Sequence, residues 1–125
     1  MSVITLTYAP PNSMFVIDDS CEGIPPSMEQ TLPPSCVLAT SSLLLVGCLM
    51  FQDGDTEITL GPANEVPHEG TIVFDGYIET PNGMIWISTV EESVVAKQKV
   101  GTLSTRVRVW TNHPTEPDRI IVGTG

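Results

Sequence analysis

The sequence predicts an all-β fold: a single-domain antiparallel β-sandwich of about eight or nine short strands, spanning residues 1–125. Three observations lead to this prediction. Short segments alternate apolar with polar residues, turn signals separate them, and 11 Pro and 10 Gly in 125 residues leave little room for long helices. When compact, a chain of this length removes about two thirds of its unfolded surface from water, so its core needs no disulfide or metal.

The predicted strands follow one another along the whole chain. The first are "VITLTY" and "SMFVID", and a proline-rich excursion follows from Cys21 to Cys36. Residues 37–51 form a nearly continuous apolar run, which indicates a central strand buried on both faces, with a buried helix as the alternative. The later strands are "TEITL", "GTIVFDGYIET", "GMIWIST", residues 93–100, "TLSTRVRVWT" and "RIIVG". Their connectivity does not follow from the pattern.

One hairpin can be predicted in detail. Asn82 and Gly83 both tolerate positive φ and favour a type I′ turn, which would pair Glu79 with Trp86. One face of this hairpin is then apolar and belongs to the core: Ile72, Phe74, Ile78, Ile85 and Ile87. The opposite face carries Asp75, Tyr77, Glu79, Met84 and Trp86. It is either a surface covered by a loop or an aromatic patch rimmed by carboxylates, a composition typical of protein-binding hot spots.

Charge is distributed unevenly along the chain. Residues 1–96 contain thirteen acids and no Lys or Arg, whereas residues 97–125 contain all five basic residues and two acids, so −13 and +3 give the net charge of −10. Such a field repels nucleic acid and anionic membranes and attracts basic proteins, although acidity also serves solubility alone. Five candidate partner-binding carboxylates lie within seventeen residues: Asp53, Asp55, Glu57, Glu65 and Glu69.

Signals for catalysis or cofactor binding are weak. Residues 53–57 begin like a calcium loop, but Ile58 stands where the sharp turn needs Gly. His68 and His113 each lie beside a proline in a predicted loop, and the sequence contains neither a G-x-S-x-G motif nor a glycine-rich phosphate loop. We therefore predict a protein that is not an enzyme and that uses no cofactor or metal.

Cysteine usage and hydropathy bear on the compartment. Cys21, Cys36 and Cys48 lack C-x-x-C spacing, which predicts free thiols in a reducing cytoplasm; a disulfide between Cys21 and Cys36 is the alternative for an exported protein. No signal peptide is visible, and the apolar run from Leu43 to Phe51 is far shorter than the roughly 20 residues of a membrane helix. The prediction is a cytoplasmic protein.

The order of segments resembles the competence protein J type of bacterial nuclease inhibitor. The resemblance lies in "LTYAPPNSMFVIDDS" at the start, "IETPNGMIWIS" in the centre, and "RVRVWT" followed by "DRIIV" at the end, and it spans nearly the whole chain. It implies a protein that binds and inhibits a nuclease and has no catalytic residues of its own. The proline-rich stretch from Gly23 to Pro34 and the dense acidity depart from the family pattern, so no functional residue is carried over.

These observations favour a non-enzymatic acidic protein that binds and inhibits a basic partner protein, most specifically a nuclease. The clustered carboxylates would steer the partner, and Tyr77 and Trp86 would anchor it. The alternative is a self-associating structural or carbohydrate-binding sandwich, in which the same two aromatic residues face a sister subunit or a sugar ring. A carboxylate-based hydrolase, with Asp75 and Glu79 as its pair, is the weakest reading because any acidic β-protein offers such pairs.

Overall fold

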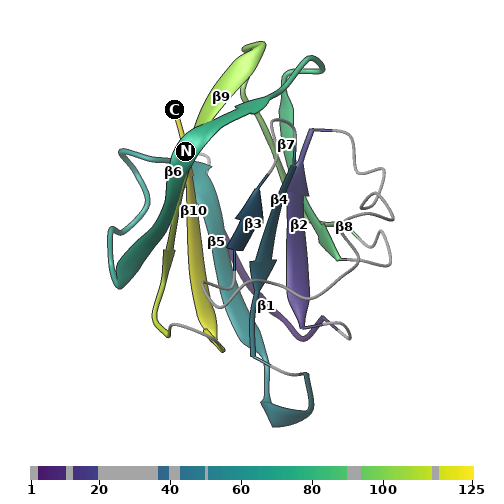
Figure 1. Cartoon of the computed structure of the whole chain (residues 1–125), viewed down its shortest axis with the longest axis vertical. Helices are drawn as coiled ribbons and strands as arrows, with labels where there is room; N and C mark the ends of the chain where they lie inside the picture. The colour runs from purple at the N-terminus through teal and green to yellow at the C-terminus, as the bar shows by residue number, and fades with distance from the viewer. Residues whose placement is uncertain are drawn as a thin grey trace.

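The computed structural model describes residues 3–10, 13–19, 37–39, 43–49, 51–89, 94–113 and 116–125. In these ranges the chain forms ten β-strands and one short 3-10 helix, and Figure 1 shows the strands arranged as two facing sheets. The predicted all-β sandwich is therefore confirmed, with ten strands rather than eight or nine. No helix of the described ranges is long and apolar enough to cross a membrane. A cytoplasmic location stays a prediction.

Each sheet has five strands. The first sheet contains, in spatial order, β1 (Ile4–Tyr8), β5 (Thr56–Pro62), β10 (Arg119–Thr124), β9 (Ser104–Thr111) and β6 (Thr71–Glu79). The second contains β3 (Val37–Ala39), β4 (Leu43–Gly47), β2 (Met14–Asp18), β7 (Met84–Thr89) and β8 (Val94–Lys99). The short helix η2 (Phe51–Asp53) precedes β5. Neighbouring strands are antiparallel, as predicted, except that β5 and β10 run parallel.

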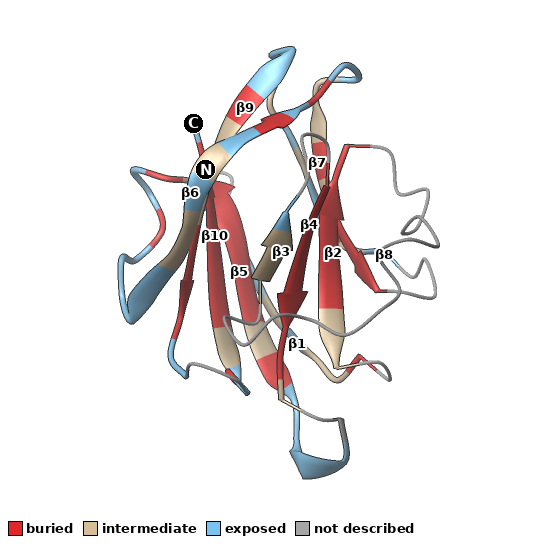
Figure 2. Ribbon diagram, viewed as in Figure 1, coloured by how far each residue is buried: buried red, intermediate tan, exposed pale blue. Residues whose placement is uncertain are grey.

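The main core lies between the two sheets and draws side chains from both. Figure 2 shows buried residues concentrated on the central strands. The second sheet contributes Phe15, Ile17, Leu44 and Val46, and the first contributes Ile58, Leu60, Val107, Val109, Ile120 and Val122. Burying one such side chain contributes about 1.5–3 kcal/mol. Cys48 is a buried thiol of this core, whereas Cys21, Cys36 and the proline-rich excursion lie outside the described residues.

The apolar run at 37–51 forms two strands instead of one. β4 carries five buried residues and lies between β3 and β2, so the prediction of a strand buried on both faces is confirmed for Leu43–Gly47. β3 pairs back onto it with Val37 opposite Val46 and Ala39 opposite Leu44. The polar residues 40–42 interrupt the apolar run between these two strands. This reversal accounts for one of the additional strands.

The predicted hairpin at Asn82 does not form, because β6 and β7 belong to different sheets. β6 pairs with β9, with Glu79 opposite Ser104, and β7 pairs with β2 and β8, with Trp86 opposite Asp18 and Lys97. None of the pairs predicted across the turn is present. The segment joining β6 to β7 crosses from one sheet to the other.

Hydrogen bonds to residues that adjoin strands of both sheets hold this crossing segment in place. On the side of the first sheet, Thr80 donates its N–H to Leu103 O (2.9 Å) and its hydroxyl to Thr102 O (2.6 Å). On the other side, the carboxylate of Asp19, just after β2, accepts the backbone N–H groups of Asn82 (3.0 Å) and Met84 (3.3 Å).

The geometry of the turn also departs from the prediction. A type I′ turn needs positive φ at both central residues, but only Gly83, at φ 68°, has it, and Asn82 does not. The N–H of Gly83 bonds to Thr80 O (2.9 Å), so the turn has Pro81 at its second position, which suits an ordinary type I turn. A type I turn does not match the right-handed twist of the two strands that a two-residue hairpin loop connects.

The predicted inner face is correct except at one end. Ile78, Ile85 and Ile87 are at most 1% exposed in the core, and Phe74 packs against it. Ile72 was expected there but is 45% exposed. The register of β6 against β9 shifts between Ile72 and Phe74, and this bulge inserts one residue and turns Ile72 to the outer face.

Candidate partner-binding surface

Six carboxylates gather at one end of the sandwich, which we call the acidic end: Asp53, Asp55, Glu57, Glu69, Glu116 and Asp118. The parallel pairing of β5 and β10 creates this end, because both strands start there and Glu57 lies opposite Arg119. Two backbone bonds, from Glu57 N to Asp118 O (2.8 Å) and from Leu49 N to Pro117 O (2.9 Å), flank the loop that contains η2. The two ends of this loop, which extends to the bottom of the view in Figure 1, are therefore bonded to residues 117 and 118.

Glu69 reaches the acidic end through the loop of residues 63–70, which packs on the outer face of the first sheet. Val66 forms a small buried cluster with Trp110 and Ile121. The ring of His68 stacks on Trp110, with centroids 4.5 Å apart, and its Nε2 lies 2.6 Å from Ala63 O. These contacts fix the path of the loop, so the position of Glu69 is set by packing.

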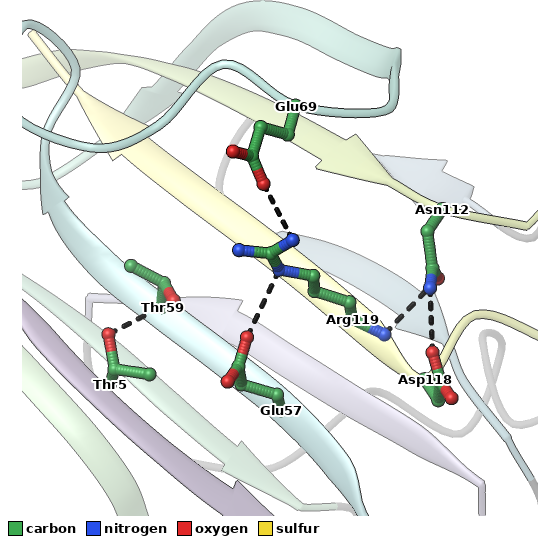
Figure 3. Close-up of polar contacts among 7 residues, drawn as sticks. All are labelled: Thr5, Glu57, Thr59, Glu69, Asn112, Asp118 and Arg119. Carbon is green, nitrogen blue, oxygen red and sulfur yellow. Dashed lines mark hydrogen bonds and ion pairs between the residues drawn. The ribbon is translucent and has the colours of Figure 1, made fainter.

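Arg119 is the organising group of the acidic end (Figure 3). Its Nη1 lies 2.6 Å from Glu69 Oε1, and its Nε lies 3.1 Å from Glu57 Oε1 in an ion pair without hydrogen-bond geometry. Its backbone N–H donates to Asn112 Oδ1 (3.2 Å), and Asn112 Nδ2 donates to Asp118 Oδ1 (2.6 Å). Because these side chains are about half exposed, each ion pair contributes only about 0–1 kcal/mol. Their main effect is to position the carboxylates.

The six carboxylates of the acidic end outnumber its one basic residue, Arg119, so this end carries an excess of five negative charges. Asp53 and Asp55 are exposed and make no ion pair within the described part of the chain. Exposed like charges at one end act over about 8 Å at physiological salt, which is enough to steer a cationic partner during approach. Across the described ranges, no group of three His, Cys, Asp or Glu is arranged to hold a metal ion.

The remaining predicted carboxylates lie away from this end. Asp75 and Glu79 point outward from β6, and Glu65 lies in the turn after β5, where its N–H bonds to Pro62 O (2.9 Å). Asp75 accepts two hydrogen bonds of 2.8 Å from Nε and Nη2 of Arg106. These bonds hold the pKa of Asp75 below its ordinary value and raise the pKa of Arg106.

The predicted aromatic patch does not form. Tyr77 lies on the outer face of the first sheet and is 65% exposed. Trp86 lies on the outer face of the second sheet, half-buried, with Lys97 Nζ 5.3 Å from its ring centroid. The two rings are on opposite faces of the sandwich because their strands belong to different sheets. Both also lie toward the end opposite Asp53 and Asp55.

Three residues of this surface were missed in the sequence. Glu116 and Asp118 belong to the basic last segment, and only the pairing of β10 with β5 brings them to the acidic end. Ile72 was assigned to the core, but the bulge places it on the outer face opposite Trp110, three residues from Glu69. It supplies an exposed apolar side chain near the start of β6. No sequence signal marks this bulge.

Comparison with solved structures relates this architecture to a known protein. The crystal structure of ComJ from Bacillus subtilis, an inhibitor of the DNA degrading activity of NucA, matches with a TM-score of 0.62 over 97% of this chain and 93% of that chain. This chain has the fold of ComJ. The two sequences are 10% identical, so the likeness confirms the resemblance to competence protein J type inhibitors at the level of the fold. No protein-family model and no curated protein matches the sequence.

Proposed function

We propose that this protein is a non-enzymatic inhibitor of a basic nuclease and that the nuclease docks on the acidic end. The observation that carries the proposal is that three separate segments of the chain bring carboxylates to the acidic end, where Arg119 forms ion pairs with Glu57 and Glu69. Asp118 is linked to the backbone of Arg119 through Asn112. The likeness of the fold to ComJ supports the same function, since ComJ inhibits a nuclease.

The physical basis of such inhibition is charge complementarity. A nuclease site is positively charged because it must hold phosphates, so ordered carboxylates can occupy it and exclude the nucleic acid. Glu57 and Glu69 are held in place by Arg119, which lowers the entropic cost of presenting them to a partner. Asp53 and Asp55 add exposed charge that speeds encounter.

An apolar contact is needed as well, because a purely ionic complex would dissociate quickly at physiological salt. At the acidic end this contact is assigned to Ile72, which is 45% exposed and lies beside the buried cluster of Val66, Trp110 and Ile121. Tyr77 and Trp86 lie too far toward the opposite end to share this interface as a pair. The proposal therefore transfers the anchoring role from these rings to Ile72.

The test compares two double variants with the same change in charge. Asp53→Asn with Asp55→Asn removes exposed carboxylates at the acidic end, whereas Glu65→Gln with Glu79→Gln removes two exposed carboxylates elsewhere. Glu57 and Glu69 are left intact because they hold Arg119. Association with a nuclease encoded beside this gene is measured from low to high salt, together with DNA cleavage.

We expect the first variant to associate several-fold more slowly, with a flatter salt dependence, and the second to stay close to the wild type. Ile72→Ala should leave association unchanged and speed dissociation, because its contribution is a desolvated contact. Trp86→Ala serves as the matched apolar control. Equal effects of the two double variants would place the docking surface elsewhere. Failure to inhibit any such nuclease at low salt would reject the inhibitor function and favour the self-associating or carbohydrate-binding module.

A further inference from the structure

A pocket of about 430 Å³ lies at the end of the sandwich opposite the acidic end. Its walls come from both sheets: Gln98 and Lys99 of β8, Ser104 and Arg106 of β9, and Tyr77 of β6. Thr102, in the segment between β8 and β9, closes it on one side. Its volume is in the range of small-molecule sites, about 300–1,000 Å³.

The charged side chains lining this pocket, Lys99 and Arg106, are both basic, in a chain that has fifteen acids and five basic residues. Arg106 is held by its two hydrogen bonds with Asp75, so its charge is largely offset. Lys99 is exposed and makes no ion pair in the described ranges. The neighbouring Arg108 is directed to Gly125 O at 3.3 Å. Lys99 is therefore the cation available to a ligand.

Hydrogen-bonding groups surround this cation. Ser104 presents an exposed hydroxyl, and the hydroxyl of Thr102 lies 3.0 Å from that of Thr105. The side chain of Gln98 is held in place because its Oε1 accepts a hydrogen bond from the hydroxyl of Thr124 (3.1 Å). The exposed ring of Tyr77 adds a flat apolar wall. The site thus combines one cation, several neutral donors and one aromatic surface.

This combination suits one ligand chemistry. The guanidinium of Arg106 already donates two hydrogen bonds to the Asp75 carboxylate. It is therefore not available to bind the carboxylate of a ligand through two parallel hydrogen bonds. A lysine ammonium is a compact point charge and, with surrounding hydroxyls, suits the several oxygens of a phosphate group. Tyr77 would cover the organic part of the molecule. We propose that the pocket binds a small phosphate monoester, with Lys99 at the phosphate and Tyr77 against the remainder.

The experiment is a titration of the full chain with ribose 5-phosphate, followed by backbone amide chemical shifts. Ribose, inorganic phosphate and acetate are titrated at matched ionic strength. We expect saturable shifts at Thr102 and Ser104 with ribose 5-phosphate, weaker ones with inorganic phosphate, and none with ribose or acetate. Lys99→Gln should weaken binding about ten-fold or more, because it removes the charge-assisted hydrogen bonds.

Two control variants distinguish binding in the pocket from nonspecific electrostatic attraction of the phosphate to lysine. Lys97→Gln removes the same charge from the same strand, but Lys97 lies over Trp86 and does not line the pocket, so binding should not change. Tyr77→Ala should weaken binding of ribose 5-phosphate and leave inorganic phosphate unaffected. Absence of saturable shifts with both phosphates, equal losses in the two lysine variants, or acetate binding as well as phosphate would each overturn the proposal. Nuclease inhibition does not enter this test, so the two proposals fail independently.

Discussion

β6 and β7 follow each other after only four residues, yet their environments differ. Both bury an inner row, with Ile78 on β6 and Ile85 and Ile87 on β7. The outer row of β6 is exposed at Asp75, Tyr77 and Glu79, whereas the outer row of β7 is half-buried at Met84 and Trp86 and buried at Ser88. Side-chain alternation therefore identifies the inner row of each strand. The position of the strand in its sheet decides how exposed its outer row is.

The position of each strand in its sheet explains this contrast. β6 is an edge strand with β9 as its single neighbour, whereas β7 lies between β2 and β8. Asp75 and Glu79 on the edge strand place charge where unpaired backbone groups would otherwise invite association with another sheet. The edge position of β6 thus accounts for the charged residues on its exposed outer row.

The largest expected effect tests the inner rows. Ile87→Ala should lower the free energy of unfolding by about 2–5 kcal/mol, because it leaves a cavity in a fully buried site. Glu79→Ala, on the exposed outer row of β6, should cost less than about 1 kcal/mol. Urea melts of both variants measure the difference. The reverse order would show that the assignment of inner and outer rows is wrong.

The next effect tests what separates β6 from β7. Asp19→Ala should lower the free energy of unfolding by about 1–3 kcal/mol, because the N–H groups of Asn82 and Met84 lose a charged acceptor. Hydrogen exchange at these two amides should accelerate selectively. Asp55→Ala, which removes an exposed carboxylate, is the control. Unchanged exchange at Asn82 and Met84 would mean that Asp19 does not hold the crossing segment.

The smallest expected effect concerns Asp75 and Arg106 on the outer row. The pKa of Asp75 is lowered in the folded protein, so its stabilisation is present above the ordinary carboxyl pKa and is lost as the pH falls through the lowered value. Asp75→Asn should therefore be slightly less stable than the wild type at neutral pH and equally stable in strong acid. Melts across this pH range should show no such difference in an Arg106→Gln background. A difference that persists in that background would assign the effect to another partner.

The acidic end shows how much of the candidate site the sequence could predict. Asp53 and Asp55 follow an apolar strand and adjoin a turn signal, so their exposure is expected locally. Glu116 and Asp118 join them only because β10 pairs in parallel with β5, and Ile72 joins because β6 carries a bulge. Long-range pairing and a one-residue bulge leave no periodic signal. The predicted aromatic patch of Tyr77 and Trp86 is absent for a related reason, because β6 and β7 pair in different sheets.

The sequence by itself determined the fold class and, apart from Ile72 at the bulge of β6, the inward-facing residues of the predicted hairpin strands. Period-two alternation is a property of each strand alone, since successive side chains point to opposite faces wherever the strand lies. Only the tertiary structure decided which strands pair. Backbone N–H and C=O groups are chemically the same in every strand, so they do not select a neighbour. That choice depends on contacts between residues far apart in the sequence, such as Asp19 with the N–H of Asn82 and the N–H of Thr80 with Leu103 O. These contacts exist only once both sheets have formed.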